Sequence, residues 1–165
     1  MAWEVIGILE IERKWIIDKQ KLPYDLDALD HYEIVQAYIS FSPTIRIRKI
    51  ENIHKNILTI KSSSKDGGLS REEYEIEISD RQFDELLKKC EGLMLHKTRY
   101  RVKENDLLYE IDFFHEEYEG FAYMEIEFED AERARNYPDP VWAIKDVTYD
   151  KRYTNASLAK GKLPE

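Results

Sequence analysis

Strict alternation of apolar and polar side chains is the feature that most restricts how this chain can fold. It runs through Gly7–Trp15, Gln36–Ile50, Asn56–Ser62, Leu69–Ser79, His96–Lys103, Leu107–His115 and Tyr123–Glu129. A period of two places successive side chains on opposite faces of a β-strand. The sequence therefore predicts a mainly antiparallel β-protein, in which the loop Ser62–Gly68 (SSSKDGG) is one hairpin connection.

Helical patterns are short and few. Arg81–Cys90 has apolar residues at helical spacing, and Ser79 and Asp80 precede it as N-cap candidates. Further short helices are predicted at Tyr24–His31, Asp130–Tyr137 and Asn155–Lys162. Many strands with few inserted helices and no linker predict one domain over residues 1–165, of α+β or closed antiparallel architecture.

The overall charge and the apolar runs narrow the class of partner. The chain has 25 Lys and Arg against 34 Asp and Glu, a formal net charge of −9, which argues against a general nucleic-acid or anionic-membrane surface. No apolar run reaches a membrane-spanning length, and Met1–Leu9 lacks the basic start and cleavage site of a signal peptide. We therefore expect a cytoplasmic protein without nucleic-acid or membrane partners, and a homodimer is left open.

Candidate sites based on cysteine and histidine have little support. The single Cys90 excludes a disulfide framework and a multi-cysteine zinc site, and fits a buried small hydrophobe. The four histidines are scattered without metal-ligand spacing. Only His115, which follows the charged strand at 107–114, is a candidate to face a functional site.

One face of each predicted strand carries long charged side chains, and their signs are segregated by strand. The basic runs are Arg46 with Arg48, and Lys97 with Arg99 and Arg101; the acidic runs are Glu73 with Glu75, Glu110 with Asp112, and Glu125 with Glu127. The plainer interpretation is a single-layer sheet with one solvated charged face. Such a face would more often mix the two signs, so that neighbouring strands attract each other.

A barrel with the charged faces turned inward gives the pattern a chemical purpose. Arg and Lys side chains match phosphate oxygens in geometry and charge. Carboxylates are the ligands that hard divalent cations such as Mg²⁺ or Mn²⁺ prefer. A lumen that has a basic wall and an acidic wall predicts a site for a metal-bound oligophosphate.

The segment Glu10–Trp15 (EIERKW) resembles the Glu-x-Glu-x-Lys signature of the CYTH superfamily, the triphosphate tunnel metalloenzymes. Other segments follow in the family's order: Arg46–Arg48, Leu58–Lys61, Arg71–Glu75, Lys97–Arg99, Glu110–Asp112, Glu125–Glu127 and Val147–Tyr153, with Asn155 and Leu158–Ala159 after them. The resemblance implies an eight-stranded antiparallel tunnel with a charged lumen, helices packed outside, and a C-terminal helix around Arg152–Ala159 that plugs one mouth. A division of Gln36–Ile50 near Pro43 would supply the eighth strand.

The resemblance also assigns roles to individual residues. Triphosphate binding falls to Lys14, Arg46, Arg48, Lys61, Lys97, Arg99 and Arg152. Metal binding, by Mg²⁺ or Mn²⁺, falls to Glu10, Glu12, Asp112, Glu125 and Glu127. The catalytic set is Glu73, Glu75, Lys97 and Arg99, with Glu73 and Glu75 where a second metal or the attacking water is held.

The function expected on this basis is metal-dependent hydrolysis of a triphosphate-containing small molecule, with inorganic tripolyphosphate as the leading substrate. An organic triphosphatase, acting on thiamine triphosphate or a nucleoside triphosphate, and an adenylate cyclase of the same superfamily are the alternatives within the family. A non-catalytic polyphosphate-binding module is the alternative from another class. Such a module gains little from carboxylates, and here every acidic pair is present.

Overall fold

The alternating segments form the strands of an antiparallel sheet that closes on itself. The computed structural model describes residues 8–64 and 66–161, so Gly7 and Lys162, at the ends of two predicted elements, lie outside it. The strands are β1 (Ile8–Ile17), β2 (His31–Phe41), β3 (Thr44–Ile50), β4 (Lys55–Lys61), β5 (Ser70–Ile78), β6 (Glu91–Glu104), β7 (Leu107–Phe114), β8 (Ala122–Glu127) and β9 (Ala143–Asp146).

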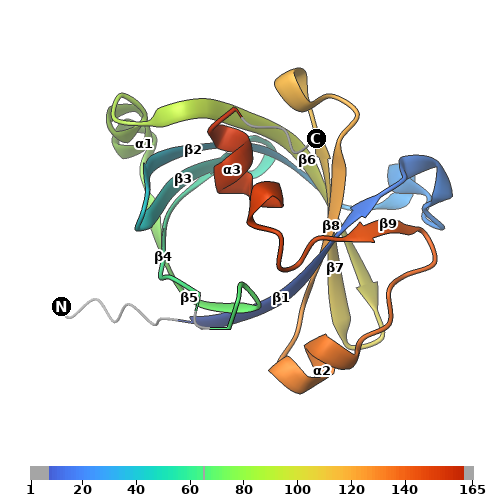
Figure 1. The fold of residues 1–165 in the computed structure, drawn as a ribbon. Helices are drawn as coiled ribbons and strands as arrows, with labels where there is room; N and C mark the ends of the chain where they lie inside the picture. The colour runs from blue at the N-terminus through green and yellow to red at the C-terminus, as the bar shows by residue number, and fades with distance from the viewer. Residues whose placement is uncertain (1–7, 65, 162–165) are drawn as a thin grey trace.

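Their order gives a closed barrel. The strands lie side by side as β5-β4-β3-β2-β6-β7-β8-β1, and β5 pairs again with β1 (Figure 1). This closing pair is short, because only Ile8–Ile11 of β1 pairs with Ser70–Glu73 of β5. Further along β1, Trp15–Ile17 pairs with β9, which lies outside the ring of eight. The eight-stranded closed barrel predicted from the sequence is confirmed.

Two sequence predictions change in detail. The segment Gln36–Ile50 is two strands, because the chain turns between Phe41 and Thr44, and the first of them already begins at His31. The helix predicted at Tyr24–His31 is wrong: only a 3-10 turn at Leu26–Ala28 forms, and His31 pairs with Tyr100 of β6 instead. The other 3-10 turns are Lys19–Lys21, Glu51–Ile53, Glu116–Tyr118 and Lys151–Tyr153.

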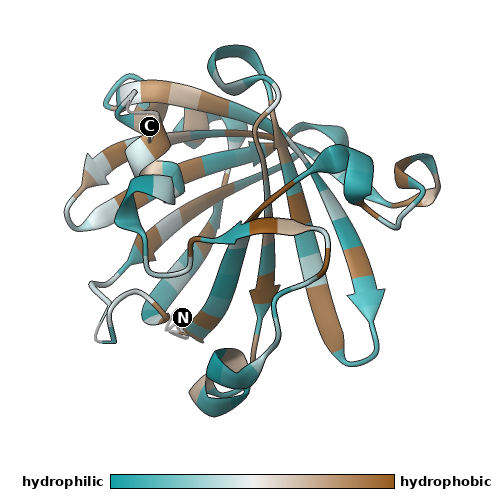
Figure 2. Cartoon of the chain, turned by 45° about the vertical axis from the view of Figure 1, so that its right-hand side comes forward, coloured by the Kyte–Doolittle hydropathy of each residue, from teal (hydrophilic) through white to brown (hydrophobic). Residues whose placement is uncertain are grey.

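The largest hydrophobic core lies outside the barrel, since the lumen takes the charged faces. Apolar residues on the outer faces of β1, β7 and β8, such as Trp15, Ile111 and Met124, are completely buried. They are covered by helix α2 (Ala131–Asn136) and by the segment that follows it. Figure 2 shows the resulting alternation of hydrophobic and hydrophilic bands along the strands.

The two remaining helices occupy different places. Helix α1 (Asp80–Leu87) starts with the predicted Ser79 cap, here a capping box with Gln82, and buries Phe83 against Ala37 and Ile47 outside the barrel. Helix α3 (Asn155–Ala159) lies across part of the barrel opening in Figure 1. In the described part of the chain, no helix is long and apolar enough to cross a membrane.

Helix α3 is seated firmly at this end of the barrel. Leu158 and Ala159 are completely buried with aromatic residues of the barrel such as Tyr38, Phe114 and Tyr123. The last turn of α3 lies against Gly92 of β6: a Cβ atom there would be 2.2 Å from the carbonyl oxygen of Ala159. Because the contact is this close, α3 forms a fixed wall at one end of the lumen, as a plug helix does.

Candidate active site

The inward faces of the barrel strands line a cavity of about 680 Å³. All but three of the predicted site residues lie on its wall: Glu10, Glu12, Lys14, Arg46, Arg48, Lys61, Glu73, Glu75, Arg99, Glu125 and Glu127. They come from six strands that are far apart in the sequence, and the period of two turns them all toward the lumen. The cavity is therefore the charged chamber that the strand patterns predicted.

Three predicted site residues do not line this cavity. The Lys97 and Asp112 side chains are 0% and 1% exposed and form an ion pair with each other. Arg152 is exposed, and its Nε and Nη2 atoms donate to the two carboxylate oxygens of Asp150, at 2.9 and 2.7 Å. His115 is also outside the cavity wall, with its Nε2 atom 2.7 Å from Thr98 Oγ1.

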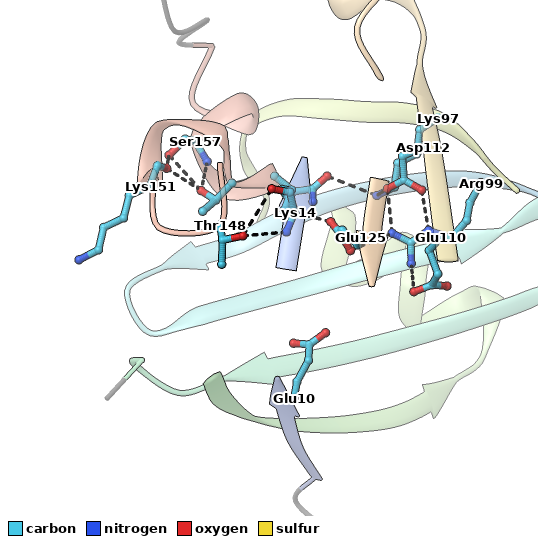
Figure 3. Close-up of polar contacts among 12 residues, drawn as sticks. Glu10, Lys14, Lys97, Arg99, Glu110, Asp112, Glu125, Thr148, Lys151 and Ser157 are labelled. Atoms are coloured by element: carbon cyan, nitrogen blue, oxygen red, sulfur yellow. Dashed lines mark hydrogen bonds and ion pairs between the residues drawn. The ribbon is translucent and has the colours of Figure 1, made fainter. Parts of the chain in front are cut away.

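The buried carboxylate of Asp112 fixes the orientation of Arg99. Arg99 donates to it from Nε (2.6 Å) and from Nη2 (2.8 Å), and Lys97 donates to it as well (Figure 3). Burial would raise the pKa of Asp112, but Arg99 and Lys97 outweigh it and hold the pKa below its usual value. Both carboxylate oxygens already accept hydrogen bonds, so Asp112 orients a cavity cation and is not open to a metal ion in this arrangement.

Most charges on the cavity wall are matched by an opposite charge on a neighbouring strand. Lys14 Nζ lies 3.0 Å from Glu125 Oε1, and these two residues are directly opposite each other on β1 and β8. Lys61 Nζ lies 2.8 Å from Glu10 and 3.0 Å from Glu73. Basic and acidic side chains from different strands thus meet across the lumen face and offset much of each other's charge.

These pairs keep the paired carboxylates ionised in spite of burial. Burial raises the pKa of Glu125, yet the charges of Lys14 and Arg99 bring it down to about 2. Burial likewise opposes the ionisation of Glu73, but Lys61 and Arg46 lower its pKa overall. The paired part of the wall is therefore charged, and internally compensated, at neutral pH.

Arg48 is the exception among the predicted barrel cations. Among the described residues, no carboxylate lies within ion-pair distance of its guanidinium, whose Nη2 atom donates to the Gln36 amide oxygen at 3.3 Å. Its Nε atom is buried without a hydrogen-bond partner. Burial and the nearby charges of Arg46 and Arg99 lower the pKa of Arg48 to about 10. Arg48 is still protonated at neutral pH and carries a positive charge that has no ion-pair partner among the described residues, although Asp112 and Glu110 attract it from farther away.

A complementary pair of carboxyl groups lies between β1 and β8. Glu12 and Glu127 are directly opposite each other, and both line the cavity. Burial, Glu125 and Glu10 raise the pKa of Glu12 to about 8. Burial and the carboxylates of Glu10, Glu110 and Glu73 also raise the pKa of Glu127. The cavity thus has one place that attracts an anion and another that attracts a cation.

The similarity of the chain to known proteins agrees with this geometry. Residues 9–139 match the CYTH domain. The chain belongs to the CYTH family. A relative from Nitrosomonas europaea, named inorganic triphosphatase, is 36% identical over 153 residues, covering 91% of this chain and 96% of the relative. A second inorganic triphosphatase, from Acetivibrio thermocellus, is 37% identical over 128 residues, covering 76% and 78% of the two chains.

A solved CYTH-type structure has the same fold. The crystal structure of the inorganic triphosphatase NE1496 is similar with a TM-score of 0.65 and 31% identity, covering 94% of this chain and 97% of that one. The CYTH resemblance drawn from the EIERKW segment and the strands that follow is therefore confirmed over most of the chain.

The residues present fit the metal dependence of the CYTH family. As they stand, no three His, Cys, Asp or Glu side chains of the described residues converge closely enough to hold a metal ion. The donor chemistry nevertheless suits a hard cation, because Glu12 and Glu127 are carboxyl groups without a basic partner in ion-pair contact within the described chain, and a divalent ion would displace the proton that Glu12 holds. A divalent ion would supply the compensating charge.

The sequence analysis assigned no role to several residues that line or support the site. Arg71 and Glu110 line the cavity, and the alternation already placed them on the same faces as Glu73 and Asp112. Arg13, in the middle of the EIERKW segment, faces outward and donates to the carbonyl oxygens of Ala134 and Tyr137, at 3.0 and 2.7 Å. It holds the segment that covers the outer core, and no sequence pattern announces that long-range contact.

Proposed function

We propose that this CYTH protein is a metal-dependent triphosphatase whose substrate is inorganic tripolyphosphate. The observation that carries the proposal is that one cavity holds a cation, Arg48 on β3, and a carboxyl pair, Glu12 opposite Glu127 on β1 and β8, that have no ion-pair partner among the described residues. A metal-bound oligophosphate offers both opposite charges in one ligand. The relatives named inorganic triphosphatase support the same substrate.

Phosphate binding would begin at Arg48 and extend to the paired cations. Arg46, Lys14, Lys61 and Arg99 line the same cavity, and each can exchange a carboxylate partner for a phosphate oxygen. Arg99 is held in place by Asp112, which Lys97 binds in turn, so the orientation of Arg99 need not be restored when the ligand arrives. Lys97 would act on the substrate through this network, as a positioning residue.

Metal binding would fall to Glu12 and Glu127, with Glu10 and Glu125 beside them on the same strands. We expect Mg²⁺ or Mn²⁺, since both prefer carboxylate oxygens. A bound divalent ion would neutralise charge on the phosphate oxygens. The carboxylates supply its site, and their repulsion in its absence makes that site favourable.

Among the proposed catalytic carboxylates, Glu75 is the better placed to orient the attacking water. Glu73 is held between Lys61 (3.0 Å) and Arg46 (3.5 Å). Glu75 lies 4.0 Å from Arg46, accepts a hydrogen bond from Thr59 at 3.3 Å, and is about half exposed. Because it has no short ion pair, Glu75 can accept a hydrogen bond from water and hold its proton as the phosphoanhydride bond is cleaved.

A substrate panel tests the proposal. Phosphate release would be measured from tripolyphosphate, ATP and thiamine triphosphate with Mg²⁺, with Mn²⁺ and with EDTA, and cyclic AMP would be measured in the ATP samples. We expect metal-dependent release of phosphate, fastest from tripolyphosphate. Faster hydrolysis of either organic substrate, or formation of cyclic AMP, would replace the proposed substrate with an organic triphosphate. Tripolyphosphate binding without turnover would instead indicate a binding module.

A further inference from the structure

Gln36 is a neutral polar side chain that bridges two functional groups of the cavity wall. It is 0% exposed and lies on β2, directly opposite Arg48 of β3. Its amide oxygen accepts from Arg48 Nη2 at 3.3 Å, and its amide nitrogen donates to the Tyr38 hydroxyl at 3.4 Å. The strand pattern did not single it out, because it carries no charge.

The position of Gln36 is unusual when it is compared with equivalent positions on other strands. Opposite Lys14 stands Glu125, opposite Arg99 stands Asp112, and opposite Lys61 stands Glu73. Opposite Arg48 stands an amide. Arg46 also faces neutral side chains, Tyr38 and Thr59, but it reaches Glu73 of β5 at 3.5 Å. Glutamine and glutamate have nearly the same shape, so the amide is what leaves Arg48 without a carboxylate directly opposite it.

The amide has a second consequence for Arg48. Because the guanidinium donates to the Gln36 oxygen, the side chain is held against β2 without being neutralised. Arg48 also lies near Arg46 and Arg99, which repel it and would otherwise favour its displacement. A neutral acceptor therefore fixes the orientation of this cation and preserves its charge.

We propose that Gln36 is a positioning residue that sets the affinity of the cavity for the triphosphate, by holding Arg48 in place while leaving its positive charge unpaired. The inference rests on the proposed triphosphatase function and deepens it. It assigns the anion affinity of the free protein to an uncharged residue that does not itself need to touch the substrate.

The test is Gln36→Glu, which keeps the shape of the side chain and adds a carboxylate opposite Arg48. The matched control is Gln20→Glu, the same chemical change at an exposed position of the 3-10 turn Lys19–Lys21. Binding of tripolyphosphate is measured by calorimetry in EDTA, so that neither metal nor turnover enters the result. KM, kcat and thermal unfolding are measured in parallel.

We expect Gln36→Glu to weaken tripolyphosphate binding about tenfold to hundredfold, with a larger change in KM than in kcat. The melting temperature should stay the same or rise, because Arg48 gains an ion pair. A purely structural role of the amide predicts the opposite, a lower melting temperature with unchanged affinity. That result, or an affinity equal to that of Gln20→Glu, would overturn the inference.

A second variant covers the case in which Gln36→Glu does not fold. Gln36→Met is neutral and of similar size but cannot accept from Arg48, so its affinity should lie between those of the wild type and Gln36→Glu. If only Gln36→Met folds, an affinity equal to that of the wild type overturns the inference. Failure of the proposed function would look different, because the wild type itself would then neither bind nor hydrolyse tripolyphosphate.

Discussion

Two stretches of the same cavity wall differ in the kind of ionisable group, basic or acidic, that has no ion-pair partner among the described residues. Between β2 and β3, Arg48 faces an amide and has two further arginines nearby. Between β1 and β8, Glu12 faces Glu127 and lies near further carboxylates. Elsewhere on the wall, charges such as Lys14 and Glu125 are paired at 3.0 Å.

The difference shows how a lumen crowded with charge can be stable and still bind a charged ligand. Pairing across neighbouring strands offsets most of the cost of bringing like charges together within one strand. The remaining cost falls at two places, where it lowers the pKa of Arg48 and raises the pKa values of Glu12 and Glu127. A ligand that carries both opposite charges relieves both at once, whereas a simple anion or cation relieves only one.

The largest expected effect comes from removing the divalent cation that the carboxyl groups between β1 and β8 would bind. EDTA should abolish turnover, and Mg²⁺ added in excess should restore it, because the carboxylates there have no other compensating charge. Glu127→Gln should raise the Mg²⁺ concentration needed for half-maximal activity. Glu85→Gln, an exposed change on α1, is the control and should leave it unchanged. Full turnover in excess EDTA would contradict this half of the comparison.

The corresponding change on the β2–β3 side should be somewhat smaller. Arg48→Gln should raise KM for tripolyphosphate about tenfold to hundredfold, since one unpaired cation is lost and the paired ones remain. Its melting temperature should not fall, because repulsion from Arg46 and Arg99 is relieved. Arg81→Gln, at an exposed position of α1, is the matched control. Wild-type KM in Arg48→Gln would place this arginine outside the site.

The pH dependence should separate the two sides further. Glu12 has a pKa raised from its ordinary value of 4.5 to about 8 in the folded protein, so between these values the folded state holds a proton that the unfolded state has lost. The metal-free protein should therefore lose stability as the pH rises through this window, and level off above it. Metal ions compete with that proton, so Mg²⁺ affinity should rise over the same window.

The control for this prediction is Glu12→Gln, which cannot titrate. Calorimetric Mg²⁺ titrations and thermal unfolding at several pH values should both show a flatter pH dependence in this variant than in the wild type. An unchanged pH profile would show that a group other than Glu12 titrates between pH 4.5 and about pH 8.

The smallest effect on turnover is expected at the end of the barrel that α3 closes. Gly92 and Gly120 both have positive φ angles, 72° and 89°, but only a Cβ at Gly92 would meet the α3 backbone. Gly92→Ala should therefore lower the stability by more than Gly120→Ala, by about 1–3 kcal/mol for strain of this kind. Chemical denaturation of both variants measures this. Equal losses would show that α3 is not seated against β6.

The sequence predicted which side chains face the lumen more completely than it predicted how those side chains pair with one another. A period of two assigns each side chain to a face whatever the rest of the fold does, so Glu12, Arg48 and Glu125 could be placed in the lumen. It says nothing of depth. Lys97 and Asp112 are on the inward faces of their strands but are buried behind Arg99, because the Arg99 guanidinium binds the Asp112 carboxylate and covers it.

Other differences arise from contacts that no periodic pattern encodes. Arg152 matched the family's tail segment, yet Asp150, two residues before it, holds its guanidinium outside the cavity. The pattern of charged side chains could not single out Gln36, because the side chain that accepts from Arg48 is uncharged. Local alternation predicted the strands, whereas side-chain pairing decides which residues remain open to a ligand.

Thermal unfolding with combined ligands tests the central claim most directly. This claim is that the cavity holds one cation, Arg48, and one carboxyl pair, Glu12 and Glu127, that lack ion-pair partners among the described residues. The melting temperature would be compared with tripolyphosphate plus Mg²⁺, with each alone, and with NaCl at equal ionic strength. At a hundred times the dissociation constant, the combination should add about 2.7 kcal/mol of stability and shift the midpoint by more than either component alone. A shift no larger than that in NaCl would contradict the account.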